Sequence, residues 1–542
     1  MADQKTSGAG ENERYDAIVV GAGIAGLYQL HRLRELGLKV KSFDAASNVA
    51  GTWYWNCYPG ARVDSQSYVY QYWFSDELIN EWNWSERFPA QPETERYLNF
   101  VADKLDLRKD IQFNTRVTAA DWDDDEHDWT VRTDQGDVVK TKFLISCTGM
   151  LSAPKVPPFP GHEKFRGQIA HTARYPREGI DLAGKRVGVV GTGATGIQVI
   201  QTIADEVGEL VVFQRTAQYG VPMRNYKFTD EERAHWKAKA HELKDRVQQT
   251  FTGFDFDLDN GSWHDYTKEQ RREILEKYWA DGSLAMWTGT FPEILVEEEA
   301  NAEVSEFARE KIRARIDDPA VAEIVVPTAY GFGTYRVPLE NGFYDAFNRD
   351  NVRVVDVREA PIECFTETGL KTADAEYDLD VVILATGFDA GTGSLTQMNI
   401  HGRDGRSLSE EWGRDIRSTL GLQVAGYPNL FTVAGPLAPS TAFCNMTTCL
   451  QQQVDWVTDC MTYLLDKGNV SIEPSVEKQD EWVQHHDDTA NATLMMKTNS
   501  WYTGANIDGK PRRLLSYIGG VGNYRRICDE VKDSDYAGFV ID

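Results

Sequence analysis

Short apolar runs alternate with longer charged segments along this chain, and several of the runs lead straight into glycine. The clearest are residues 17–20, 143–149, 187–190, 381–387 and 429–436. Apolar runs of about four to eight residues, bounded by glycine or proline, are typical of strands buried in a parallel sheet. The pattern therefore predicts an α/β protein in which helices cover parallel sheets.

The order of these runs predicts that one nucleotide-binding domain is inserted into another. A first strand–helix–strand unit spans residues 16–44, and a second begins only near residue 185. The proline-rich stretch 154–160 is a natural crossing between the two, and residues 229–318 carry charged segments of helical period. The predicted parts are a disordered lead over 1–14, a first nucleotide-binding domain over 15–150 and 388–542, a second over 151–228 and 319–387, and a helical insertion over 229–318.

Each nucleotide unit carries a GxGxxG turn between its first strand and its helix. The turns consist of Gly21, Gly23 and Gly26, and of Gly191, Gly193 and Gly196. A single turn of this kind is a weak signal, but two copies in the same setting predict two Rossmann-like dinucleotide sites, in which backbone N–H groups at a helix N-terminus bind a pyrophosphate.

The residue that ends the second strand differs between the units. Asp44 follows Gly26 by 18 residues, and Arg215 follows Gly196 by 19. A carboxylate there accepts hydrogen bonds from ribose hydroxyls, whereas an arginine neutralises a 2′-phosphate. The first unit is therefore predicted to bind FAD and the second NADPH or NADP+, with Thr195 and Thr216 as further contacts; together these cofactors imply hydride transfer to a flavin.

Charge and cysteine content narrow the choice of partners. The formal net charge of −27 argues against nucleic acid and anionic membranes. No uninterrupted apolar stretch reaches membrane-spanning length and the N-terminus is polar, so we expect a cytoplasmic protein with no membrane association. The seven cysteines are odd in number and form no CxxC pair, which predicts free thiols and no metal site.

Residues 50–64, AGTWYWNCYPGARVD, follow the Asp44 strand end directly. On composition alone the aromatic side chains fit core packing equally well. A loop in this position lies beside the flavin, however, which makes Thr52 and Trp53 candidate cofactor contacts. It also allows Asp64 to lie near the flavin ring and next to a cation.

This segment resembles the fingerprint of the Baeyer–Villiger monooxygenases, with every fixed position present. A second family fingerprint is matched by Phe165, Gly167, His171, Thr172 and Pro176. It departs at Tyr175, where the family usually has tryptophan and where the related flavin-containing monooxygenases of amines and sulfides often have another aromatic residue. The resemblance implies that His171 couples the domains rather than transferring protons.

Two further segments extend the resemblance over residues 15–540. Residues 331–352 resemble the family segment that carries the active-site arginine, here Arg336, although an ordinary surface ion pair is the alternative for any arginine. Tyr335 replaces the lysine that commonly precedes it, which predicts a weaker preference for NADPH over NADH. Residues 500–506 resemble a segment whose tryptophan contacts the nicotinamide ribose, here Trp501.

The resemblance implies an NADPH- and O2-dependent enzyme that converts cyclic or aryl ketones to lactones or esters through a flavin C4a-peroxide and a tetrahedral adduct. Arg336 would stabilise the anionic species, and Asp64 would orient Arg336. The predicted partners are a small ketone and O2, and no obligate protein partner is evident. The alternatives are a monooxygenase of amine nitrogen or sulfide sulfur, and a dinucleotide-binding protein without turnover.

Overall fold

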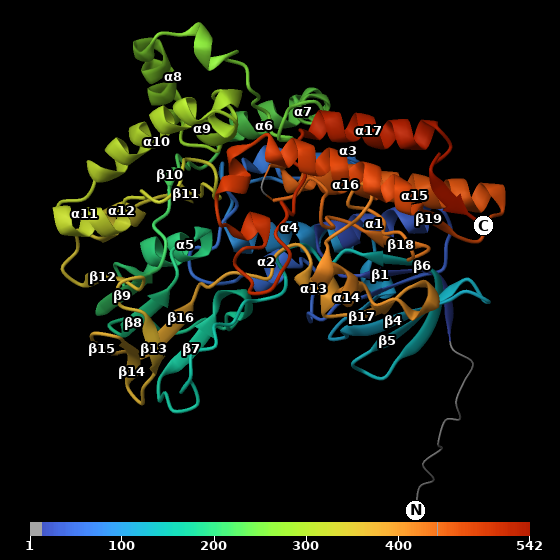
Figure 1. Ribbon diagram of the computed structural model, residues 1–542, viewed down its shortest axis with the longest axis horizontal. Coiled ribbons are helices and arrows are strands. Elements are labelled where there is room, and N and C mark those ends of the chain that lie inside the picture. The colour runs from blue at the N-terminus through green and yellow to red at the C-terminus, as the bar shows by residue number, and fades with distance from the viewer. Residues whose placement is uncertain (1–12, 442) are drawn as a thin grey trace, which may run out of the picture.

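The computed structural model describes residues 13–441 and 443–542, and most of its strands gather into two sheets (Figure 1). The first sheet has the order β17–β4–β5–β6–β1–β2–β3, and β18 also pairs with β6. Its strands are β1 (Arg14–Val20), β2 (Val40–Phe43), β3 (Ile111–Gln112), β4 (Val117–Asp123), β5 (Asp128–Thr133), β6 (Val138–Ser146), β17 (Asn399–His401) and β18 (Leu430–Thr432). Residues 1–12 of the disordered lead predicted over 1–14 lie outside the described residues. The prediction is wrong at its end, because Arg14 belongs to β1.

The second sheet has the order β12–β9–β8–β16–β7, and all of its pairings are parallel. Its strands are β7 (Gln168–His171), β8 (Arg186–Val190), β9 (Glu209–Gln214), β12 (Val352–Asp356) and β16 (Val381–Leu384). A small antiparallel sheet of β13 (Ile362–Phe365), β14 (Gly369–Thr372) and β15 (Glu376–Asp378) lies beside it (Figure 1).

The order in which the chain forms the strands of the two sheets confirms that the second nucleotide-binding domain is inserted into the first. It builds the first sheet through β6, passes through all five strands of the second sheet, and returns with β17 and β18 to the first. The fold is of the α/β class, as predicted, but the first sheet is mixed rather than parallel, because β5 pairs antiparallel with both β4 and β6. The limits proposed for each domain stay predictions.

Each nucleotide unit has the predicted strand–helix–strand order, with α1 (Ile24–Glu35) between β1 and β2 and α5 (Ala194–Ile203) between β8 and β9. The main helices elsewhere are α2 (Thr52–Trp55), α3 (Asp76–Glu81), α4 (Gln91–Lys104), α12 (Phe343–Ala346), α13 (Gly393–Thr396), α14 (Leu408–Arg414), α15 (Met446–Lys467), α16 (Val476–Asn491) and α17 (Val521–Asp533). Within the described part of the chain, no helix is both long and apolar enough to cross a bilayer.

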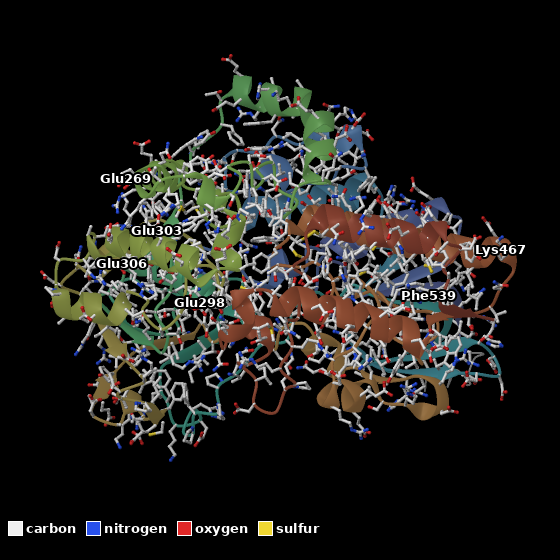
Figure 2. The ribbon with its side chains drawn as sticks, turned by 45° about the horizontal axis from the view of Figure 1, so that its top comes forward. Glu269, Glu298, Glu303, Glu306, Lys467 and Phe539 are labelled. Atoms are coloured by element: carbon white, nitrogen blue, oxygen red, sulfur yellow. A yellow bond between two sulfur atoms is a disulfide. The ribbon has the colours of Figure 1, made fainter. Side chains whose placement is uncertain are left out.

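The stretch predicted as a helical insertion folds into five helices. They are α6 (Asp230–Ala238), α7 (Ala240–Val247), α8 (Lys268–Asp281), α9 (Ala285–Thr288) and α10 (Glu298–Arg313), and α11 (Pro319–Val325) follows beyond the predicted limit. In Figure 1, α8, α9 and α10 lie above the second sheet, and α6 and α7 lie nearer to α17. The helices α8 and α10 carry the acidic side chains labelled in Figure 2, Glu269 on the first and Glu298, Glu303 and Glu306 on the second. A short parallel pair, β10 (Val221–Pro222) with β11 (Leu339–Glu340), joins the two ends of this region.

Strand register sets where the sites form. Val20 pairs with Phe43 on one side and with Ser146 on the other, so β1, β2 and β6 end level with one another. In the second sheet Val190 is likewise level with Phe213 and Leu384. Ligands of open α/β sheets bind at this carboxyl edge, and each glycine turn begins there.

Candidate functional site

The two glycine turns have nearly the same backbone. Gly21 and Gly191 both have φ of +105°, a conformation that other residues rarely adopt. A Cβ at Gly21 would lie 2.6 Å from the carbonyl oxygen of Cys147, and one at Gly191 would lie 2.5 Å from that of Ala385. Both turns therefore require glycine, because the neighbouring strand leaves no room for a side chain.

A cavity of about 570 Å³ opens beside the first turn, which is within the size range of cofactor sites. Several predicted residues line it, namely Gly21, Gly23, Asp44, Thr52, Trp53 and, from the second unit, Thr195. Gly26 does not line the cavity but allows close packing. A Cβ at this position would collide with the carbonyl oxygen of Gly21, so glycine lets the start of α1 lie against the turn. The cavity, the glycine cradle and the free helix N-terminus fit a dinucleotide such as FAD.

Asp44 is 7% exposed at the rim of this cavity. Its two carboxylate oxygens accept hydrogen bonds from the backbone N–H groups of Ala22, at 2.6 Å, and of Ala46, at 2.7 Å. Burial raises the pKa of the carboxyl group, and these two hydrogen bonds oppose the rise. Asp44 thus fixes the glycine turn to the end of β2, and each oxygen keeps a lone pair for a ribose hydroxyl.

The second turn is open by comparison. Arg215, at the end of β9, is exposed and makes no hydrogen bond or ion pair with any residue that the structure describes. It nonetheless acts on two neighbours: it opposes the burial that raises the pKa of Tyr335, and it adds to the burial that lowers the pKa of Lys155. Arg215, Thr216 and Lys155 thus provide polar and cationic groups that suit a phosphate.

Arg336 and Asp64 lie together, as the resemblance implied. Nη2 of Arg336 donates a hydrogen bond of 3.1 Å to Oδ2 of Asp64, and Nη1 donates one of 2.8 Å to the carbonyl oxygen of Thr441. The arginine side chain is 21% exposed and that of Asp64 is 9% exposed. Two loops that lie 272 positions apart in the sequence therefore meet at one largely buried ion pair, in contrast to the exposed surface pair of the alternative.

The charge of Arg336 is stable in this setting. Burial disfavours it, but attraction to Asp64 and interaction with Tyr502 prevail and raise the pKa of the guanidinium. Burial also raises the pKa of the Asp64 carboxyl group, against the opposing effect of Arg336. Oδ1 of Asp64 is buried with no hydrogen-bond partner among the described residues. The pair thus combines a fixed cation with unused hydrogen-bonding capacity.

Three groups at this site were not found from the sequence. Trp287 of α9 lies with its ring centre 5.7 Å from the guanidinium carbon of Arg336, so the helical insertion contributes to the site. The Thr441 carbonyl comes from the loop between β18 and α15, where no motif marks a contact with Arg336. Tyr502 follows the predicted Trp501 directly, and that adjacency was the one available signal.

The 50–64 loop also contacts the second nucleotide unit. The hydroxyl of Tyr58 donates to Oε1 of Gln198 on α5, at 2.9 Å. Gly60 has φ of +81°, and a Cβ there would collide with the carbonyl oxygen of Gln198 and with Oγ1 of Thr202. Part of the fingerprint therefore serves packing between the units.

The second fingerprint lies along β7 and the turn after it. Nε2 of His171 is 3.2 Å from the carbonyl oxygen of Lys155 and 3.2 Å from Oγ1 of Thr386. Tyr175 is 4% exposed, and its backbone oxygen accepts from Sγ of Cys57, at 3.3 Å. His171 thus joins the crossing segment to the end of β16, a position compatible with the structural role implied for it.

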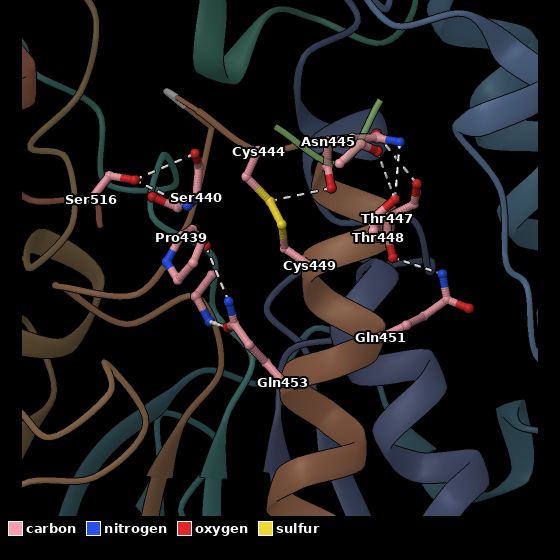
Figure 3. The surroundings of a disulfide bond; sticks show 12 residues. Pro439, Ser440, Cys444, Asn445, Thr447, Thr448, Cys449, Gln451, Gln453 and Ser516 are labelled. Carbon is pink, nitrogen blue, oxygen red and sulfur yellow. Dashed lines mark hydrogen bonds between the residues drawn. A yellow bond between two sulfur atoms is a disulfide. The ribbon is translucent and has the colours of Figure 1, made fainter. Parts of the chain in front are cut away.

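The expectation that all seven cysteines are free thiols is wrong. Cys444 and Cys449 form a disulfide at the start of α15, while Cys57, Cys147, Cys364, Cys460 and Cys528 are free (Figure 3). The separation of five residues between these cysteines matches no known sequence motif. In the structure, Asn445 is the N-cap of α15, and the start of this helix brings the Cα atoms of Cys444 and Cys449 to 6.4 Å. Among the described residues, no three potential ligands gather as a metal site would require.

Comparison with known proteins gives one family and several full-length relatives. Residues 15–227 match the family described as flavin-binding monooxygenase-like. The chain is 55% identical to the acetone monooxygenase (methyl acetate-forming) of Gordonia sp. (strain TY-5), over 97% of this chain and 99% of that protein. It is 40% identical to the cyclopentanone 1,2-monooxygenase of Comamonas sp. (strain NCIMB 9872), over 97% of this chain and 96% of that protein.

Solved structures agree with these matches. The crystal structure of an OTEMO complex with FAD and NADP superposes with a TM-score of 0.94 at 40% sequence identity, covering 97% of this chain and 99% of that one.

Proposed function

Because the chain belongs to the Baeyer–Villiger monooxygenases, we propose that it uses FAD, NADPH and O2 to convert ketones to esters or lactones. The observation that carries this proposal is the buried pair of Arg336 and Asp64 next to the cavity beside the first glycine turn. Thr441 belongs to both places, since its carbonyl binds Arg336 and the residue lines the cavity.

The cavity beside the first turn would hold FAD, and the second turn would hold NADPH, with Arg215 and Thr216 at its phosphate end. When bound, the flavin takes electrons from NADPH and activates O2. Thr52, Trp53 and Thr195 line the flavin side of the cavity. Trp501, half-buried at the start of a short helical turn (Trp501–Thr503), is the proposed contact of the nicotinamide ribose.

Arg336 supplies the positive charge that ketone oxidation requires. Negative charge develops on the carbonyl oxygen as a nucleophile adds to a ketone, and a fixed donor stabilises it most in a site that excludes water. The guanidinium does not lose its proton in the working pH range, and Asp64, Thr441 and the Trp287 ring hold it in one orientation. A monooxygenase of amines or sulfides attacks an electron-rich atom and has no such requirement.

The ketones in the names of the two relatives above, acetone and cyclopentanone, support small ketones as the proposed substrate class. Acetone and cyclopentanone differ in shape, so chain length and ring size of the ketone are left to substrate profiling. We also propose a cytoplasmic location, supported by the five cysteines that are free thiols among the described residues. No partner protein is needed for the proposed reaction.

Replacing Arg336 by alanine tests the assignment. The variant should still bind flavin and be reduced by NADPH, but ester formation should fall by on the order of 10²- to 10³-fold, as when a catalytic donor is removed. Product chromatography and NADPH absorbance measure the two activities in the same reaction. Arg358→Ala, which removes an arginine paired with Asp356 on the second unit, is the matched control and should behave as the wild type.

Ester formation by Arg336→Ala at the wild-type rate would show that another group stabilises the reacting oxygen. A panel of linear ketones, cyclic ketones and thioethers separates the two enzyme classes. Esters or lactones support the proposal, whereas sulfoxides alone would support the alternative monooxygenase.

A further inference from the structure

Two arginines of the second nucleotide unit lie against α2, a helix that borders the cavity of the first unit. Both follow β7 in the chain, and each stacks on one of two neighbouring aromatic side chains. The guanidinium carbon of Arg174 lies 4.2 Å from the ring centre of Trp55, and that of Arg177 lies 4.2 Å from the ring centre of Tyr54. A guanidinium is attracted to the face of an aromatic ring at such distances. The second unit therefore contacts α2 through two adjacent side chains.

Arg177 also makes two hydrogen bonds to the first unit. Its Nη1 donates to the carbonyl oxygen of Tyr54, and its Nη2 donates to Oε1 of Glu95 on α4, both at 2.6 Å. The side chain of Glu95 is 14% exposed, and its other carboxylate oxygen accepts from Gln91, at 2.8 Å. The rigid fork of a guanidinium suits two fixed acceptors of this kind. One side chain of the second unit thus joins two helices of the first.

These contacts lie next to the place where the flavin is proposed to bind. Thr52, Trp53 and Trp55 of α2 line the cavity beside the first glycine turn, and so does Arg174. A shift of α2 would therefore change the wall of this cavity. The position of that wall depends on contacts made by the second unit as well as by the first.

The second unit meets the 50–64 loop at another point, beyond α2. Tyr58 donates to Gln198 on α5, and Nε2 of Gln198 donates to the carbonyl oxygen of Arg62, at 3.0 Å. Two separate contacts fix the orientation of one unit relative to the other, whereas a single contact acts as a pivot. Without the contacts of Arg177, the α5 contact would remain and the units could turn about it.

We propose that Arg177 is a positioning residue for flavin reduction: it holds the second unit against α2 in the orientation that brings NADPH to the flavin. The inference rests on the proposed function for its effect on reduction, but not for its effect on α2. The reaction moves one hydride from NADPH, which leaves as NADP+, to the oxidised flavin. A displacement of about 1 Å can slow a reaction about 100-fold, so a contact that sets orientation should affect the rate more than the binding.

The test is Arg177→Met in the full-length, flavin-loaded protein. Methionine keeps much of the side-chain length but removes the charge and the donors. At saturating NADPH the rate of flavin reduction should fall about tenfold, which equals about 1.4 kcal/mol, as measured by stopped-flow absorbance. The flavin content, the reduction by dithionite and the KM for NADPH should change little. An unchanged reduction rate, loss of the flavin, or a change confined to the KM would overturn the proposal.

Arg271→Met is the matched control, because Arg271 has the same three kinds of contact within the helical insertion. It pairs with Glu303, which is labelled in Figure 2, at 2.7 Å, and donates to the carbonyl oxygen of Tyr266, also at 2.7 Å. Its guanidinium carbon lies 3.8 Å from the ring centre of Trp263. This variant should be reduced at the wild-type rate. An equal loss in both variants would assign the effect to a general loosening of the fold and would also overturn the proposal.

Glu95→Gln tests the same contact from the first unit. Glutamine has the size of glutamate and keeps an acceptor for Arg177, but the hydrogen bond loses its charge. Charge-assisted hydrogen bonds are about twice as strong as neutral ones, so flavin reduction should slow by about threefold. A wild-type rate in this variant would overturn the proposal even if Arg177→Met failed to fold.

Hydrogen–deuterium exchange gives a readout that does not depend on activity. The N–H groups of Trp55 and Asn56 donate to the carbonyl oxygens of Gly51, at 3.0 Å, and Thr52, at 2.9 Å. Local opening of α2 exposes these groups, so their exchange should become about threefold faster in Arg177→Met and stay unchanged in Arg271→Met. Unchanged exchange in Arg177→Met would contradict the positioning role whether or not the flavin is reduced. A wild-type protein that NADPH does not reduce would instead contradict the proposed function.

Discussion

The two glycine turns have the same backbone conformation but different surroundings. Gly21 and Gly191 share φ of +105° and the same close approach of a neighbouring strand. The second glycines differ, because a Cβ at Gly23 would lie 3.4 Å from Cα of Gly51, whereas one at Gly193 would meet nothing within 4 Å. The first turn is thus covered by the loop that follows its own second strand, and the second turn faces open space.

The strand-end residues repeat this difference. Asp44 is buried and hydrogen-bonded to two backbone N–H groups, whereas Arg215 is exposed and unpaired among the described residues. A covered site with its polar groups already satisfied suits a cofactor that stays bound, and an exposed site suits one that enters and leaves in each cycle. The two sites therefore differ in what covers the turn rather than in the backbone of the turn itself.

The largest predicted effect comes from adding a methyl group to each turn. Gly21→Ala should lower flavin affinity more than about 100-fold, because backbone strain of up to about 3 kcal/mol adds to a collision with the Cys147 carbonyl oxygen. Gly191→Ala should keep its flavin and lose NADPH-dependent reduction instead. Flavin absorbance after desalting and stopped-flow reduction measure the two properties.

Gly37→Ala is the control for this pair, since Gly37 has φ of +73° but open space around its Cβ position. It should retain both flavin content and reduction by NADPH. If Gly21→Ala and Gly191→Ala lost the same cofactor, the assignment of one nucleotide to each turn would be wrong.

A smaller effect is predicted for Arg215→Ala. Losing a charge-assisted contact with the 2′-phosphate costs about 1.5–3 kcal/mol, so the KM for NADPH should rise roughly 10- to 100-fold. The KM for NADH should change little, since NADH has no phosphate there. Steady-state kinetics with both nucleotides measures the ratio.

The reciprocal change is Tyr335→Lys, which adds a cation next to Arg215. A partly exposed charge is worth under about 1 kcal/mol, so preference for NADPH should rise by no more than about fivefold. A higher KM for NADPH in Tyr335→Lys, or equal effects of Arg215→Ala on both nucleotides, would place the phosphate elsewhere.

The smallest predicted effect concerns the ion pairs at the start of the two central strands. Arg186 lowers the pKa of Asp380 from its ordinary 3.8 to about 2. Asp380 therefore stabilises the fold above about pH 4, and this stabilisation is lost as the pH falls through about 2. The side chain is 39% exposed, so Asp380→Asn should cost less than about 1 kcal/mol at pH 7, and the difference should vanish in acid unfolding near pH 2.

The corresponding pair in the first unit provides the contrast. Burial raises the pKa of Asp128, which is paired with Arg14. Because the pKa of Asp128 is raised in the folded state, the contribution of this carboxyl group to stability declines as the pH rises through that pKa. Asp128→Asn should therefore show the opposite pH trend, and parallel trends in the two variants would contradict the assigned shifts.

The parts predicted correctly from the sequence are those set by local pattern. Both strand–helix–strand units follow from apolar runs that lead into glycine, and the return of the chain to the first sheet follows from the order of those runs. The pairing of Arg336 with Asp64, 272 positions apart, came from resemblance to a family. No local pattern specifies which distant loops meet at a sheet edge.

The parts that were missed depend on distant contacts. Trp287 reaches Arg336 from a helix in the insertion, and nothing in the residues around it differs from ordinary core packing. The Cys444–Cys449 disulfide depends on the chain reversal before α15, and its spacing resembles no redox motif. In both cases the partner is defined by how the chain returns to the site, which composition and periodicity do not determine.

Gly60 gives the fingerprint loop a consequence for protein engineering. The loop leaves the first nucleotide unit and rests on α5 of the second at a point with no room for a β-carbon. The Pro59–Gly60 pair therefore packs the first nucleotide unit against the second, while Asp64, four residues later, is the proposed partner of Arg336. A screen that measures product alone would not distinguish a variant whose two nucleotide units pack incorrectly from a variant that lacks a catalytic residue. Libraries that seek faster cofactor exchange should therefore vary Gln198 and Thr202, which lie opposite the loop, and leave Gly60 unchanged.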